Sequence, residues 1–161
     1  MRTLNRILWI LAITPALGGF SFAQVEKAAM KTTGISCGMC AAVSEVYLRQ
    51  LPGIDKIKIS LSQESIMVSY KPGAAFQPKQ LHEALKKTDV GIVQLQIGAR
   101  GRIERQGEKR FFVAGNDKFV LVATPNGAEI PPNTPLTIEG ILNDRAQPME
   151  LKILTFKPAK Y

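Results

Sequence analysis

The 161-residue sequence has few of the side chains from which active sites and disulfide scaffolds are built. It contains two cysteines, one histidine and one tryptophan, and aromatic residues make up only 7% of it. Two cysteines are too few to staple a small scaffold together, so we expect them to form a site. No Ser-His-Asp set, phosphate-cradling glycine loop or pair of acidic residues stands out. We therefore expect a protein that is not an enzyme.

Long apolar runs are missing after residue 23. The first 23 residues begin with Arg2 and Arg6, continue with an apolar run over residues 7–13, and close with a small-x-small pattern at residues 21–23. This pattern predicts a secretory signal peptide (1–23), cleaved after Ala23, and hence a periplasmic or secreted protein. The apolar run is shorter than the roughly 20 residues of a membrane span, although retention as an anchor is the alternative.

Acidic residues are outnumbered by basic ones, 13 to 21. The predicted signal peptide carries two of the arginines and no acid, which leaves 19 basic against 13 acidic residues, a net charge of +6. An exported chain seldom meets nucleic acid, and no basic stripe interleaved with aromatic residues is visible. We therefore expect no nucleic-acid partner and a solvated basic surface. Attraction to anionic lipid headgroups or to an acidic partner stays open.

The two cysteines, Cys37 and Cys40, stand two residues apart in the stretch from Gly34 to Cys40. An alternating, strand-like segment precedes this stretch and a helical pattern follows it, so both thiols are expected at the start of a helix. The unpaired N–H groups and the positive dipole end of that helix favour thiolate over thiol. Such a pair can capture a soft metal ion or exchange disulfides. A disulfide that only closes a short loop is the third alternative.

Hydrophobic periodicity between residues 28 and 97 predicts four strands and two helices. In chain order these are strand 28–32, helix 41–51 with Val43 and Val46 widening its inner face, strands 57–61 and 66–70, helix 78–88, and strand 93–97, with Leu61 and Val93 among the inward residues. The order βαββαβ is ferredoxin-like. We therefore expect an α+β domain over 24–99, with both helices on one face of an antiparallel sheet.

The pattern changes after Ala99. A cluster of charged residues with a hairpin turn at Gly107 is followed by short apolar runs separated by Gly, Pro, Asn and Asp. This spacing predicts about five strands in a small all-β domain over 100–161. The pattern is faintly similar to an oligonucleotide/oligosaccharide-binding (OB) barrel, and it assigns no ligand.

Two motifs carry a resemblance to a known family. A Gly-apolar-Ser-Cys-x-x-Cys loop occupies residues 34–40, and Leu51-Pro52-Gly53-Ile54 follows the first predicted helix. With these motifs, the chain from Val25 to Ala99 resembles the heavy-metal-associated domain. That domain occurs in copper metallochaperones, in extensions of copper and zinc transporting ATPases, and in the periplasmic mercury-binding protein. The resemblance covers a little under half of the chain and implies the ferredoxin-like fold that the periodicity predicts.

The resemblance implies that Cys37 and Cys40 are metal ligands. Two sulfurs suit Cu(I) or Hg(II), whereas Zn(II) and Cd(II) are less suited because structural Zn(II) prefers four ligands. Two thiolates on an exposed loop would let a membrane metal transporter or another two-thiol domain take the ion over. The alternative is a thiol–disulfide oxidoreductase using the same residues. Against it, the lone tryptophan is Trp9, far from Cys37, and no βαβ unit of the thioredoxin type is predicted.

Five further residues carry weaker expectations. Ile35 is expected in the core, and Met39 is expected to shield the site or pack locally rather than to bind metal. Ser36 is expected to hydrogen-bond within the loop and could orient a thiolate. His82, the only histidine, is expected to be a solvated helix residue rather than a ligand. Val90 aligns with the position where relatives carry a lysine or an aromatic residue facing the metal loop.

Overall fold

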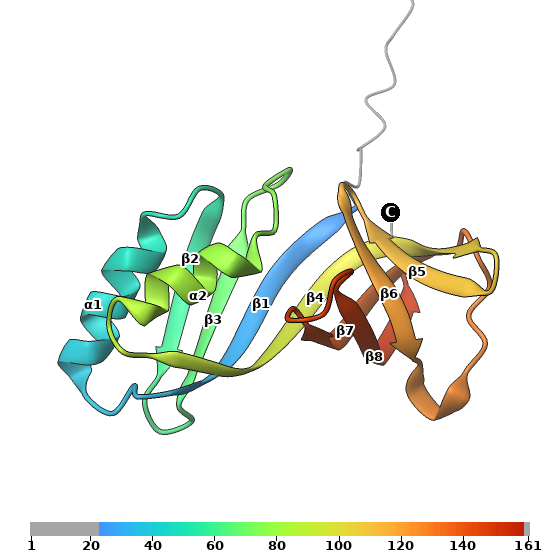
Figure 1. Ribbon diagram of the computed structural model, residues 1–161. Coiled ribbons are helices and arrows are strands. Elements are labelled where there is room, and N and C mark those ends of the chain that lie inside the picture. The colour runs from blue at the N-terminus through green and yellow to red at the C-terminus, as the bar shows by residue number, and fades with distance from the viewer. Residues whose placement is uncertain (1–22, 160–161) are drawn as a thin grey trace, which may run out of the picture.

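The computed structural model describes residues 23–159, so residues 1–22 of the predicted signal peptide lie outside the described part of the chain. Its first half follows the predicted order. The elements are β1 (Gln24–Thr33), α1 (Gly38–Arg49), β2 (Ile54–Ser60), β3 (Ser65–Tyr70), α2 (Pro78–Lys86) and β4 (Gly91–Gln106). The strands pair antiparallel in the order β2-β3-β1-β4, and both helices lie on one face of this sheet (Figure 1). The predicted ferredoxin-like fold is confirmed.

The second half is a five-stranded barrel that includes the end of β4 (Figure 1). The added strands are β5 (Lys109–Ala114), β6 (Asp117–Ala123), β7 (Pro135–Asn143) and β8 (Glu150–Pro158), with a short 3₁₀ turn η1 (Pro125–Gly127) between β6 and β7. The strands close in the order β4-β5-β6-β8-β7 and back to β4, and β6–β8 is the parallel pair. The predicted number of strands is confirmed.

Strand β4 belongs to both halves. Its first part pairs with β1 as far as Arg100, and residues 95–102 pair on the other edge with β7. Its last residues, 102–106, pair with β5. The predicted boundary between Ala99 and Arg100 therefore falls inside one continuous strand, and independent folding of residues 24–99 stays a prediction.

Four inward assignments from the sequence are wrong, those of Val43, Val46, Leu61 and Val93. Val43 and Val46 are 41% and 55% exposed, because α1 turns the side centred on Ser44 and Leu48 to the sheet. Leu61 is exposed because β2 ends one residue before it.

Val93 is wrong for a different reason, which is a β-bulge. Lys31 of β1 pairs with Gln94 and Thr32 pairs with Ile92, so Val93 has no partner in this register. A bulge of this kind moves the side chains on one side of it to the other face of the sheet. Ile92 is therefore buried, and Val93 is 64% exposed.

The two halves meet at Phe76, in the loop before α2. Its ring makes edge-to-face contacts with Tyr70 of β3 and with Phe119 of β6, at centroid distances of 5.8 and 6.3 Å. Phe76 is buried, and Phe119 is one of the fully buried residues of the barrel. Aromatic pairs of this geometry are stabilising beyond the area they bury. The core is therefore continuous from the helices into the barrel.

A candidate metal-binding loop

The loop between β1 and α1 is held against the end of α2. Gly34 has a φ of +87°, and a Cβ at this position would lie 2.6 Å from the carbonyl oxygen of Asp89. Only glycine tolerates both the left-handed conformation and this close approach. Ile35, the next residue, is fully buried, as predicted. The loop is therefore anchored on the core side, and residues 36–39 are left exposed.

Cys37 is the N-cap residue of α1, with an extended backbone (φ −142°, ψ 156°). The backbone N–H of Cys40 donates to Cys37 Sγ at a distance of 3.1 Å. The sulfur thus occupies the place that a serine or aspartate oxygen takes in most N-caps. A thiolate at this position is favoured further by the positive end of the helix dipole. Ser36 is exposed, and the cap bond recorded in this loop uses Cys37 rather than the serine hydroxyl.

The structure joins Cys37 and Cys40 in a disulfide, with their Cα atoms 5.3 Å apart. Cys37 is exposed and Cys40 is half-buried. The predicted placement of both cysteines at the start of a helix is thus observed, in the oxidised form. Their assignment as metal ligands stays a prediction, and metal binding would require the disulfide to be reduced first. Within residues 23–159, no group of three or more His, Cys, Asp and Glu side chains could hold a metal ion.

Two positions singled out in the sequence, Met39 and Val90, lie in or near the loop. Met39 is 75% exposed, so local packing, one of its two predicted roles, is wrong, and shielding of the site stays a prediction. Val90 is buried, at 3% exposed, and its aliphatic side chain gives the loop no charged or aromatic group. The group that meets Gly34 is instead the backbone carbonyl of Asp89.

An exposed apolar stripe runs along α1 from the loop. It consists of Met39, Val43 and Val46, which are 75%, 41% and 55% exposed and stand at i, i+4 and i+7. We call these three residues the α1 stripe. Apolar side chains gathered on a helix surface mark a contact site more often than single exposed residues do. The periodicity of the sequence showed these residues but placed two of them on the inner face.

The sequence predicted His82 to be a solvated helix residue, but its side chain has a partner in the barrel. Its Nε2 lies 2.7 Å from Oδ2 of Asp144, in the β7–β8 loop of the barrel. The side chain of His82 is 35% exposed and that of Asp144 is 12% exposed. His82 therefore links α2 to the barrel. Sequence reasoning missed Asp144 because 62 residues separate the pair.

Fold and loop together define a ferredoxin-like domain with two cysteines at the entrance to its first helix, which is the arrangement that the sequence motifs implied. No protein-family model matches the chain. The chain is 27% identical over 105 residues to copper-transporting ATPase 2 of Homo sapiens. The match covers 60% of this chain but only 7% of the ATPase. The predicted resemblance to heavy-metal-associated domains is confirmed by this match.

Two solved structures align with less than half of this chain. The CopZ metallochaperone is 21% identical, with 42% of this chain and 98% of CopZ covered and a TM-score of 0.39. The N-terminal domain of ZntA in the apo form is 24% identical, with 45% of this chain and 90% of that domain covered and a TM-score of 0.38. In the described part of this chain, no helix is both long and apolar enough to cross a membrane.

Proposed function

We propose that this protein is an exported, non-enzymatic carrier or scavenger of a soft metal ion, bound by the reduced thiols of Cys37 and Cys40. The observation that carries the proposal is the pair of cysteines at the exposed start of α1, with one sulfur already acting as the helix cap. The match to a copper-transporting ATPase favours Cu(I). Hg(II) has the same preference for two sulfurs, whereas Zn(II) and Cd(II) favour more ligands.

Capture of the ion would begin with reduction of the Cys37–Cys40 disulfide by two electrons and two protons from a dithiol reductant. The two thiols then lose their protons as the ion binds, so affinity falls at low pH. No third His, Cys, Asp or Glu ligand accompanies them among the described residues. A two-coordinate ion therefore has room for a thiolate of the recipient, and the ion can pass through a shared intermediate without leaving sulfur.

The α1 stripe supports a protein recipient. It begins inside the metal loop, at Met39, and continues over the next two turns of α1. A partner that covers it would bring its own thiols to the loop. We propose a second two-thiol domain or a membrane metal transporter as this partner.

A second candidate function is thiol–disulfide exchange, and the observed disulfide is what favours it. A catalyst of exchange and a metal carrier both use an activated thiol at a helix start, so thiol reactivity alone does not separate them. Handover does. A carrier loaded with Cu(I) passes the ion to another two-thiol domain without net oxidation of either protein, and shows little catalysis of insulin reduction.

The remaining parts of the proposal concern export and the barrel. We infer that the mature chain begins at Gln24, outside the cytoplasm. We also infer that the barrel is of the OB type, supported by its strand order and its parallel β6–β8 pair.

The direct test is a Cu(I) titration of the reduced mature chain against a chromophoric chelator, without oxygen. We expect one ion per chain. The double variant Cys37→Ser/Cys40→Ser should lose most of the affinity, because no thiolate remains. Met39→Leu is the matched control, since it removes the neighbouring thioether and keeps both cysteines. Undiminished binding by the double variant would sink the proposal.

A further inference from the structure

A groove of about 740 Å³ lies between the first turn of α2 and the barrel. Its described lining includes Gln77, Pro78, Lys79 and His82 from the start of α2, Lys118 from β6, and residues 144–149 from the β7–β8 loop. The groove therefore combines elements of both halves of the fold. Grooves of this size at such junctions are common binding sites for small molecules.

Positive charge in this groove exceeds negative charge. Lys79, Lys118 and Arg145 come from three different elements, and Asp144 is the one acidic residue among the described lining residues. Asp144 is already engaged by His82 at 2.7 Å, and its side chain is only 12% exposed. Its charge is thus directed to the histidine rather than to the lysines or the arginine.

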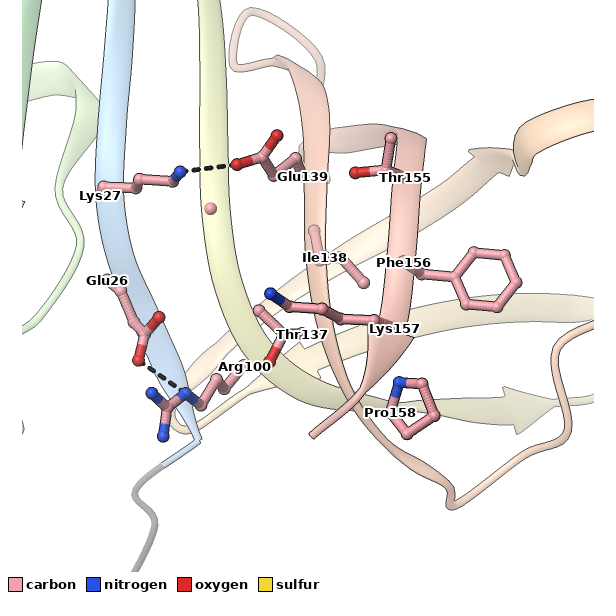
Figure 2. A pocket seen from close by; sticks show the side chains of 11 residues that line it. Glu26, Lys27, Arg100, Thr137, Ile138, Glu139, Thr155, Phe156, Lys157 and Pro158 are labelled. Atoms are coloured by element: carbon pink, nitrogen blue, oxygen red, sulfur yellow. Dashed lines mark hydrogen bonds and ion pairs between the residues drawn. The ribbon is translucent and has the colours of Figure 1, made fainter. Parts of the chain in front are cut away.

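A second groove of similar size, about 750 Å³, has a smaller excess of positive charge. It lies over Gly98 between β1 and the barrel strands β7 and β8 (Figure 2). Here both carboxylates hold cations: Lys27 pairs with Glu139 at 2.6 Å, and Arg100 pairs with Glu26 at 2.8 Å. Figure 2 shows these two pairs on either side of Lys157. With Lys157, the lining of this groove has three cations against two acids, whereas that of the groove at α2 has three cations against one acid.

We propose that the groove at α2 binds a small molecule through an oxyanion group, a phosphate or a carboxylate. Arg145 supplies a planar fork that matches either oxyanion. The ammonium group of Lys118 lies 4.3 Å from the centroid of the Phe111 ring, which holds it in place before a ligand arrives. Pro148 and Met149 line the same groove and provide apolar surface for the carbon part of the ligand. The cysteine loop contributes no residue, so this site is separate from the proposed metal site.

The test is calorimetric titration of the mature chain with inorganic pyrophosphate and, separately, with citrate, at low ionic strength. The chain is kept in its disulfide form, so thiols do not contribute. We expect saturable binding of at least one probe, and the preferred probe identifies the oxyanion. The double variant Lys118→Gln/Arg145→Gln should raise the dissociation constant about tenfold or more, because it removes two charge-assisted hydrogen-bond donors.

The matched control is Lys56→Gln/Lys58→Gln, which removes the same charge from exposed positions of β2. It should change the dissociation constant less than twofold. Equal weakening by both double variants would mean that the probes respond only to net charge, and it would overturn the proposal. The absence of saturable binding would overturn it as well.

Amide resonances of the wild-type chain give a check that needs no variant. Those of Lys118 and residues 144–147 should shift on titration, and shifts elsewhere instead would contradict the assignment.

Discussion

Gly34 lies against the backbone of Asp89, so closely that a Cβ on the glycine would be 2.6 Å from the aspartate carbonyl oxygen. This contact fixes the cysteine loop to the turn between α2 and β4. The Gly34→Ala variant should lose about 1–3 kcal/mol of unfolding free energy, because it adds both a backbone strain at φ +87° and a steric overlap. Affinity of the reduced protein for Cu(I) should fall with it, since the loop must move.

The control for this variant is in the same loop. Gly38 has no atom within 4 Å of the position its Cβ would take, and its φ is not positive. Gly38→Ala should therefore leave both urea unfolding and Cu(I) competition close to wild type. If the two variants behave alike, the close approach of Gly34 to Asp89 does not hold the loop.

The cysteine loop was predictable from the sequence because it is a local feature. The glycine, the two cysteines and the following helical period all lie within residues 34–51. The inner face of α1 was predicted too wide, because Val43 and Val46 are exposed. Ser44, on the buried side, hydrogen-bonds to Thr88 at 2.9 Å, and periodicity does not reveal a partner 44 positions away.

Strand β4 and the His82–Asp144 pair show a second reason why the sequence predicted only part of the structure: contacts between distant segments. The alternating pattern indicated where strands occur, but pairing of β4 with β1, β5 and β7 depends on contacts between segments distant in sequence. The bulge at Val93 likewise follows from the register with β1, which the alternating pattern of the sequence does not show. The composition of the sequence changes after Ala99, yet β4 continues as one strand as far as Gln106.

The α1 stripe should govern handover rather than metal affinity. We expect the double variant Val43→Ser/Val46→Ser to bind Cu(I) as wild type does, because neither valine carries a ligand atom and both cysteines are kept. Transfer to a two-thiol acceptor domain should slow by about tenfold, as apolar contact area with the partner is lost. Stopped-flow mixing of the loaded protein with apo acceptor measures the rate.

Val93→Ser is the control for handover, since Val93 is also exposed, at 64%, but lies on β4. Its transfer rate should equal that of wild type. Equal slowing of both variants would indicate a general effect of surface apolarity, and unchanged transfer in the stripe variant would mean that the partner docks elsewhere.

Asp117, at the start of β6, should make stability depend on pH. Burial raises the pKa of this carboxyl group from 3.8 to about 6, although the backbone N–H of Phe76 opposes the shift. Burial, together with the nearby charge of Asp117, also raises the pKa of the Tyr70 hydroxyl. Because the folded state prefers the protonated acid, this contribution is complete below about pH 4 and is lost as pH rises through about 6. Partial exposure limits it to about 1–2 kcal/mol.

The measurement is urea unfolding of wild type and Asp117→Asn between pH 4 and pH 8. The asparagine cannot ionise, so the variant should gain stability relative to wild type as pH rises, with the difference growing through pH 6. Asp55→Asn removes an equivalent charge at an exposed position and should show no such trend. A constant difference between wild type and Asp117→Asn across this range would contradict the assignment.

The last prediction concerns the dependence of the metal loop on the barrel. We expect a fragment of residues 24–100 to fold and to keep the Cu(I) affinity of the full mature chain, because it retains the whole pairing of β1 with β4 and every residue of the loop. It should be less stable, since Phe76 loses the contact with Phe119 and becomes more exposed. Phe76→Ala in the full chain separates these effects. It should lower unfolding free energy by about 3–5 kcal/mol, as for other buried aromatic residues, and leave metal affinity within about twofold. A fragment that folds, by its circular dichroism, yet binds Cu(I) far more weakly would show that the barrel takes part in the metal site, and the division of labour proposed between the two halves would be wrong.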